Sequence, residues 1–233
     1  MKKFLVVLLG LSGMLVAQQT QVKRALKVEE AFQPGEFLKY RIHYGFVDAG
    51  VAELRVHDYV NKQGKNTLKV TGQGRSVGMF KWFFDVRDHY ESYIDTQSVL
   101  PVEFIRDIKE GDYRDAEHAV FNQDQQVVFP KDRPQDTLGI PFGCQDLLSA
   151  FYYARTLDYD DLYLGKEFPV HVYLDEETFP INLKFVGREV LKTDVGKIPC
   201  LMFRPMLQEG RVFKDEEGMT IWVTDDKNHI PVM

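Results

Sequence analysis

The clearest indication of the fold class comes near the start of the chain, in Leu38-Lys39-Tyr40-Arg41-Ile42-His43-Tyr44. Apolar or aromatic residues alternate in it with charged or polar ones, which is the period of a β-strand with one buried face. A turn follows at residues 45–50, and the same alternation returns at Ala52, Leu54 and Val56. The pattern therefore predicts an antiparallel hairpin whose apolar side faces a core.

The alternation continues over most of the chain, and its longest run covers residues 80–94. Trp82, Phe84 and Tyr90 share one face of that expected strand, while Asp85 and His89 share the other. Shorter strands are expected at residues 67–71, 101–108, 113–121, 126–129, 168–174, 179–185, 190–195, 198–205, 211–215 and 219–224. Because short turns separate most of them, we expect an antiparallel meander that curves.

One segment changes period. In residues 145–155, Leu148, Phe151, Tyr152 and Arg155 fall at helical spacing, with Asp146 near the positive end of the helix. Apolar residues cover most of its circumference, so it should pack inside the concavity of the sheet. The expected fold class is mainly β: a curved antiparallel sheet or half-barrel partly enclosing one central α-helix.

The two ends of the chain differ from the middle. Residues 1–17 combine Lys2 and Lys3 with an apolar run and a small residue, Ala17, as in a secretory signal peptide. A retained membrane anchor is the weaker interpretation, because a spanning helix needs about 20 apolar residues. We expect a periplasmic or secreted protein that is not a lipoprotein, since no cysteine adjoins the cleavage site.

The rest of the chain is interpreted as an N-terminal extension, residues 18–31, and a single β-rich domain, residues 32–233. No Gly-, Ser- or Pro-rich linker divides that domain. The apolar run at residues 230–233 stops as it begins, so either the sequence is truncated or the final strand is very short. We expect the domain to lack its last strand.

Composition limits the partners. The 233 residues carry a formal net charge of -6, and loss of Lys2 and Lys3 would leave 27 basic against 35 acidic residues, or -8. No basic stripe is present, which argues against nucleic acid as the partner. Cys144 and Cys200 could pair in an oxidising compartment, but two buried thiols are the favoured interpretation.

Several separated motifs resemble one known family. In chain order they are Phe32-Gln33-Pro34-Gly35-Glu36-Phe37-Leu38-Lys39-Tyr40, the Tyr44-Gly45 and Ala49-Gly50 pairs, Asp88-His89-Tyr90-Glu91-Ser92-Tyr93-Ile94-Asp95, Gln145-Asp146-Leu147-Leu148-Ser149-Ala150-Phe151-Tyr152-Tyr153, and Trp222-Val223-Thr224-Asp225-Asp226. From about Phe32 onward the chain thereby resembles the exported bacterial domain of unknown function 3108. The resemblance implies a single curved antiparallel sheet partly wrapped around a helix, with a further strand beyond Pro231. It supplies no catalytic residues.

Signals for chemistry are few. The six histidines show no metal-ligand spacing, so no metal site and no cofactor are expected. Ser149 lies within the expected helix rather than in a nucleophile elbow and should pack or bond the backbone. Asp88 falls on the buried face of its strand, where a structural latch to an arginine or a tyrosine hydroxyl is favoured over a catalytic acid.

Aromatic side chains form the most distinctive feature. Core filling explains them, but a concave cavity of at least about 300 Å³ for an apolar ligand explains them too. The candidate lining residues are Tyr40, Tyr44, Trp82, Phe84, Phe151 and Tyr152. Phe83, on the polar side of its strand, is the aromatic expected to be exposed.

These observations favour a non-enzymatic periplasmic module that binds an apolar or lipid-like envelope ligand. The alternative is an assembly module that contacts an envelope protein through a sheet edge or Phe83. A weaker alternative is a hydrolase built around Asp88 and His89. No transmembrane segment is expected after removal of residues 1–17.

Overall fold

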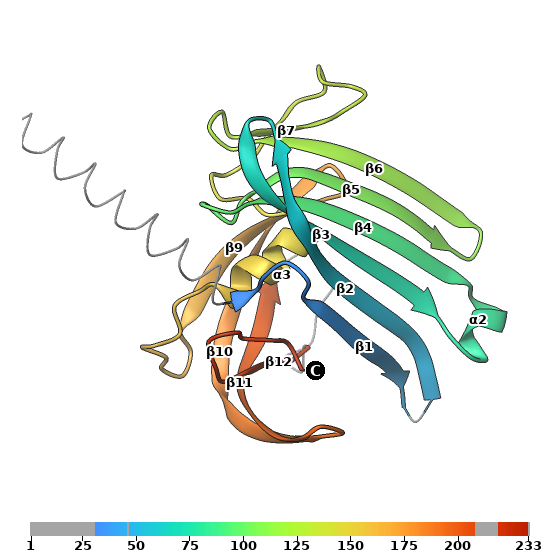
Figure 1. Ribbon diagram of the computed structural model, residues 1–233, viewed down its shortest axis with the longest axis vertical. Coiled ribbons are helices and arrows are strands. Elements are labelled where there is room, and N and C mark those ends of the chain that lie inside the picture. The colour runs from blue at the N-terminus through green and yellow to red at the C-terminus, as the bar shows by residue number, and fades with distance from the viewer. Residues whose placement is uncertain (1–30, 46, 208–218, 233) are drawn as a thin grey trace, which may run out of the picture.

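The computed structural model describes residues 31–45, 47–207 and 219–232, without the side chains of Tyr44 and Leu207. The expected signal peptide, nearly all of the N-terminal extension and the expected strand at residues 211–215 lie outside the described residues. The remaining chain is mainly β, and its strands form two antiparallel sheets rather than one (Figure 1).

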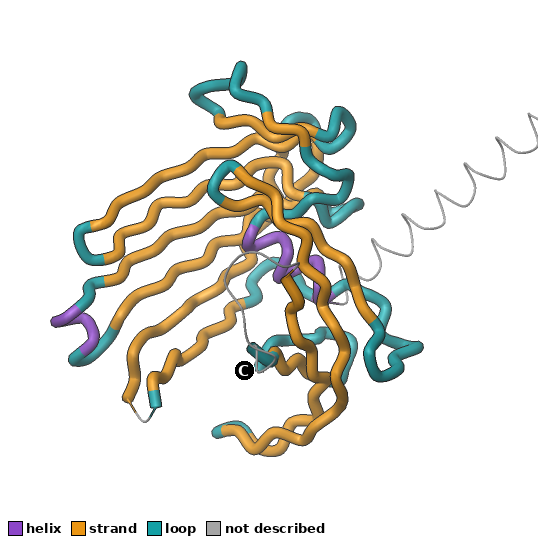
Figure 2. The backbone as a smooth tube through the Cα atoms, turned by 180° about the vertical axis from the view of Figure 1, so that it is seen from behind, coloured by secondary structure: helices purple, strands orange, loops and turns teal. Residues whose placement is uncertain are grey.

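The first sheet is an eight-stranded meander in which each strand pairs with the next along the chain. Its strands are β1 (Phe37–Tyr44), β2 (Val47–Lys62), β3 (Lys65–Ser76), β4 (Val86–Asp95), β5 (Pro101–Glu110), β6 (Tyr113–Asn122), β7 (Val127–Pro130) and β8 (Leu138–Gly139). The predicted hairpin is confirmed, with Tyr40 opposite Ala52 and Leu38 opposite Leu54. The sheet curves into a half-barrel (Figure 2), so the predicted fold class is confirmed.

The second sheet has the order β12-β11-β10-β9. Its strands are β9 (Glu167–Leu174), β10 (Glu177–Thr193), β11 (Gly196–Leu207) and β12 (Ile221–Thr224). β10 joins two strands that were predicted separately, and a bulge between Phe185 and Gly187 marks the junction. Residues 230–232 turn back along β12, where the Val232 N–H donates to the Trp222 carbonyl at 2.7 Å.

Helix α3 (Leu147–Arg155) packs between the two sheets, against β3 and β4 on one side and β9 on the other (Figure 1). Asp146 and Ser149 form a capping box at its start. Leu148 and Tyr152 enter a core with Val56, Val70 and Ile94 of the first sheet, as the helical spacing predicted. Ser149 thus bonds the backbone and is fully buried.

Residues 80–84 do not form the strand that their alternation predicted. Phe80–Phe83 form a short helix, α2, and β4 starts only at Val86. Trp82 is 91% exposed and Phe84 is 49% exposed, so the prediction that both lie on a buried strand face is wrong. A single helical turn cannot be told from a strand by periodicity, because it spans too few residues.

Cys144 and Cys200 are both buried and free, in agreement with the favoured interpretation of two thiols. None of the helices in the described residues combines the length and the hydropathy that a bilayer-spanning helix requires.

Candidate functional site: an apolar cavity between α3 and the second sheet

A cavity of about 230 Å³ lies between α3 and the face of the second sheet that is turned toward it. Almost all of its lining side chains are apolar, and they include Phe151, Val172, Ile181, Leu183, Phe203 and Ile221. The cavity is smaller than the expected minimum of about 300 Å³ for a pocket that encloses a small molecule.

Strand alternation builds the sheet wall of this cavity. Ile181 and Leu183 on β10 point inward, while Asn182 and Lys184 occupy the other face of the strand. Ile181 lies beside Val170 of β9, and Leu183 lies beside Pro205 of β11. Ile181, Leu183 and Ile221 are only half-buried, so the cavity presents an uncovered apolar surface.

Arg155 is one of the residues that line the cavity, and its contacts are structural. Its guanidinium forms a two-bond ion pair with Glu36, at 2.7 and 2.8 Å, and also bonds the carbonyl oxygens of Ala31 and Asn228. His229 packs edge-on against Tyr159, with ring centroids 4.6 Å apart, and donates from Nδ1 to the Arg155 carbonyl at 2.9 Å. Because the donors of Arg155 are occupied, this cation fixes α3 and is not available to a ligand.

Two tyrosine hydroxyls lie buried near this ion pair. Burial raises the pKa of Tyr40 to about 12, with smaller electrostatic effects from Arg155 and Glu36. Burial also raises the pKa of Tyr152; the charge of Glu36 raises it further, and that of Arg155 lowers it. Neither hydroxyl contacts a hydrogen-bond partner in the described residues. Tyr152 packs edge-on against Phe32, with ring centroids 4.7 Å apart, and is part of the hydrophobic core.

The six candidate lining residues therefore do not form one site. Phe151 lines the cavity, Tyr152 fills the core, and Tyr40 is half-buried on β1. Trp82 lies in α2 and Phe84 follows it directly, and α2 lies at the far end of the first sheet (Figure 1). The side chain of Tyr44 lies outside the described residues. Sequence reasoning missed Ile181, Leu183 and Ile221; their alternation was visible, but nothing showed that their strands face the helix.

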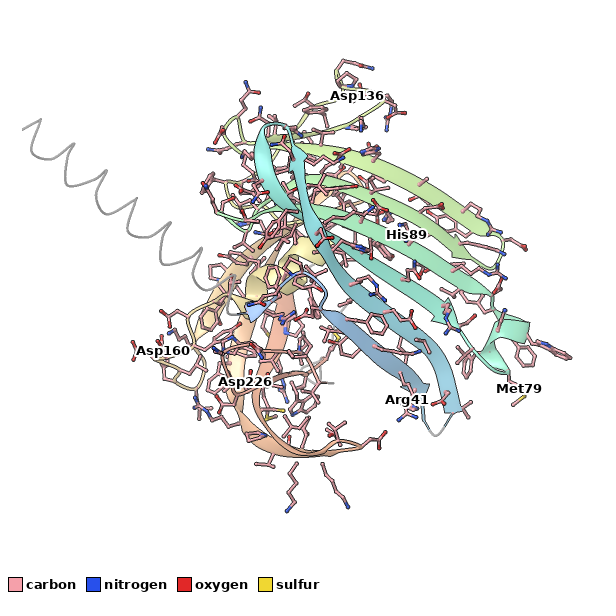
Figure 3. All side chains as sticks on the ribbon, in the orientation of Figure 1. Arg41, Met79, His89, Asp136, Asp160 and Asp226 are labelled. Atoms are coloured by element: carbon pink, nitrogen blue, oxygen red, sulfur yellow. The ribbon has the colours of Figure 1, made fainter. Side chains whose placement is uncertain are left out.

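The pair that motivated a hydrolase does not converge. Asp88 accepts a hydrogen bond from the backbone N–H of Lys109 at 3.3 Å, and burial raises its pKa. His89 lies on the opposite face of β4 and bonds Glu91 at 3.0 Å (Figure 3). Asp88 therefore latches β4 to β5, although to a backbone group rather than to the expected arginine or tyrosine. Among the described residues no group of three or more His, Cys, Asp or Glu could hold a metal ion.

Comparison with known proteins finds a matching family and solved structures of similar fold. Residues 39–233 match the model of the family described as Protein of unknown function (DUF3108). A β-barrel-like protein of domain of unknown function DUF1849 from Brucella abortus is similar in structure, with a TM-score of 0.50 and 9% identity, over 78% of this chain and 79% of that one. A DUF1089 family protein from Pseudomonas aeruginosa gives a TM-score of 0.47 and 9% identity, over 83% and 91%. No curated protein matches.

Proposed function

This chain belongs to the family described as Protein of unknown function (DUF3108), and we propose that it is an exported, non-enzymatic module that binds an apolar, lipid-like ligand. The proposed compartment is the periplasm or the cell exterior, and it is supported by the signal-peptide pattern of residues 1–17. The proposed binding site is the cavity between α3 and the second sheet.

One observation carries the proposal: Ile181, Leu183 and Ile221 line a hollow and remain half-buried although a helix and a four-stranded sheet meet around them. Apolar surface in a hollow stays in contact with water unless a ligand covers it, and covering it is favourable in proportion to its area. At about 230 Å³ the cavity suits a slender group, such as part of an acyl chain, better than a bulky ring system. Phe151 on α3 forms the opposite wall.

Native mass spectrometry of protein purified from the periplasm is the first test, because a lipid that copurifies adds a defined mass. Displacement of a fluorescent fatty acid then measures affinity. In the variant Ile181→Trp the indole fills the cavity, so the fatty acid can no longer bury its apolar surface there. We expect its affinity to fall by about tenfold or more. Val190→Trp is the matched control, because Val190 lies on the same strand but is 60% exposed.

Two results would count against the proposal. One is native protein that carries no lipid and does not bind the fluorescent fatty acid. The other is equal binding by the Ile181→Trp and Val190→Trp variants, because it would place the probe outside the cavity. The alternative expectation of a protein-binding assembly module keeps one supporting observation, the exposure of Phe83, and stays a prediction.

A further inference from the structure

Helix α2 carries an exposed apolar surface at the outer end of the first sheet. Met79, Trp82, Phe83 and Phe84 are 69%, 91%, 83% and 49% exposed, and α2 has no buried residue. We call these four residues the α2 tip. Figure 1 shows α2 projecting beyond the ends of the strands, remote from α3, and Figure 3 shows Met79 beside α2 at this end of the sheet. Large exposed aromatics gathered on one projection mark an interaction surface.

Contacts of residues 84–86 with the neighbouring strands hold the α2 tip in place. The ring of Phe84 lies over Gly111, where an added Cβ would come within 3.0 Å of it, and the Gly111 N–H donates to the Asp85 carbonyl at 3.0 Å. On the other side the Val86 N–H donates to the Ser76 hydroxyl at 3.0 Å. α2 is thus anchored to the turn between β5 and β6 and to the end of β3. Trp82 and Phe83 are presented to solvent by a fixed base.

A groove with basic walls adjoins the tip. It measures about 480 Å³, and its lining includes Arg75, Lys81 and Arg87. The carboxylate in its lining, Asp85, is already engaged by Lys109 at 3.0 Å and by Arg87 at 3.3 Å. Within the described part of the chain no carboxylate forms an ion pair with Arg75 or Lys81. The groove therefore offers cationic groups to an anion, on a protein whose net charge is -6.

We propose that the α2 tip docks on a membrane surface that contains anionic lipids, with the aromatic side chains in the interfacial layer and the basic groove against lipid phosphates. Trp and other aromatic residues favour the interface between membrane and water. Lysine can extend its ammonium group to the lipid headgroups while its aliphatic stem lies along apolar surface. Basic groups near the surface add attraction to anionic lipids. This inference goes beyond the proposed ligand binding and does not depend on it.

The shape and charge of the tip favour a bilayer over a protein partner. A projecting single turn meets a bilayer interface without requiring a matching hollow, whereas a protein partner would need a pocket shaped for Trp82 and Phe83. The combination of exposed aromatics with uncompensated cations is the pattern of an interfacial anchor. Because α2 and α3 lie at opposite ends of the first sheet (Figure 2), docking through the tip leaves the cavity uncovered.

Cosedimentation with vesicles tests the proposal on the mature chain. We expect the protein to bind vesicles that contain phosphatidylglycerol, to bind phosphatidylcholine vesicles more weakly, and to lose the difference in high salt. The variants Trp82→Ser and Phe83→Ser should each lower the partition coefficient about tenfold. Leu164→Ser is the matched control, because Leu164 is an apolar residue that is 74% exposed elsewhere.

The charge requirement has its own variant. Arg75→Gln with Lys81→Gln should reduce binding to the anionic vesicles and leave binding to phosphatidylcholine unchanged, whereas the exposed pair Lys192→Gln with Lys197→Gln should change neither. Trp82 also reports insertion directly: with Trp222→Phe it is the remaining tryptophan of the two in the chain. Its emission should shift to shorter wavelength on binding and be quenched by brominated lipid.

Failure to sediment with the anionic vesicles would overturn the proposal, as would equal losses in Phe83→Ser and Leu164→Ser. If vesicles are not bound but a crosslinker placed at residue 83 captures one defined envelope protein, and Trp82→Ser abolishes that capture, the tip is a protein-docking surface instead. Unchanged thermal unfolding of the variants shows that the losses do not come from misfolding, because the substituted side chains are exposed.

Discussion

The hydroxyl of Ser92 donates a hydrogen bond of 2.6 Å to the carboxylate of Asp146 and so joins β4 to the start of α3. The same carboxylate accepts the backbone N–H groups of Leu148 and Ser149, each at 2.8 Å. Ser92 and Asp146 are both fully buried. One side chain thus caps the helix and fixes it against the first sheet, and that helix forms one wall of the cavity.

Replacement of Asp146 tests this double role. Asp146→Ala should lower the free energy of unfolding by about 2–4 kcal/mol, because it removes an N-cap and leaves the Ser92 hydroxyl and two backbone N–H groups buried without a partner. Asp146→Asn keeps an acceptor oxygen and should cost less than half as much. Urea denaturation measures both, and equal losses in the two variants would show that the hydrogen bonds contribute little.

The protonation of Asp146 gives a second prediction. Complete burial outweighs the hydrogen bonds it accepts and raises the pKa of its carboxyl to about 6, above the ordinary value of 3.8. Between about pH 4 and pH 6 the carboxyl is therefore protonated in the folded state but ionised in the unfolded chain, so folding takes up a proton. The stability gained from this proton uptake is complete below about pH 4 and is lost as the pH rises through about 6. The stability of the native sequence relative to Asp146→Asn should fall from pH 4 to pH 6; a rise would mean that the hydrogen bonds outweigh burial.

Glu103 should show the opposite pH dependence. Burial raises its pKa, but hydrogen bonds from Lys131, Lys62 and His118 outweigh burial and lower the pKa to about 2, from 4.5. Its contribution to stability is therefore complete above pH 4.5 and is lost as the pH falls toward 2. Glu103→Gln should cost about 1–2 kcal/mol at neutral pH, a modest amount because the cations reach solvent.

The cost of Glu103→Gln should shrink as the pH falls from 4.5 to 2, which thermal unfolding across that range measures. Glu110→Gln is the control, because Glu110 lies on the same strand and forms no ion pair within the described residues. A cost of Glu103→Gln that does not change with pH would show that the carboxylate charge is not what stabilises this cluster.

Arg106 connects the two sheets. Its side chain is buried and binds Asp115 and Glu117 on β6 and Asp175 in the turn between β9 and β10. Arg106→Met should cost about 3–5 kcal/mol, because it leaves the Glu117 carboxyl buried without its cation. The double variant with Glu117→Gln should lose less than Arg106→Met alone, and additive losses in urea denaturation would show that the two groups do not interact.

Local patterns predicted the strands and α3 but not how these elements associate. Alternation located the hairpin of Tyr40 and Ala52, and helical spacing located Leu148 and Tyr152. Alternation wrongly predicted a strand at α2, where Gly78 adopts a φ of +56° and Phe84 packs on Gly111 from another hairpin. That contact is between residues far apart in the sequence, so no local pattern could report it.

The cavity shows the same limit. Phe151 was predicted to line a cavity as one of the aromatic residues on the helix, but the sequence did not show that the strands form two sheets. Ile181 and Leu183 had the alternation of an inward face, but the predicted lining consisted of aromatic residues, which bury large areas. The wall of the cavity became visible only from the register of β9, β10 and β11.

The two cysteines provide a last prediction, which concerns burial rather than pairing. Cys144 and Cys200 are 0% and 1% exposed, and burial raises the pKa of both thiols, that of Cys144 to about 12. A thiol reacts as its thiolate, so both should resist a disulfide reagent in the folded protein. In denaturant without reductant two thiols should react for each chain. If no thiol reacts in denaturant, the chain carries a disulfide. If the native protein reacts rapidly, the region around one of the two cysteines opens readily to solvent.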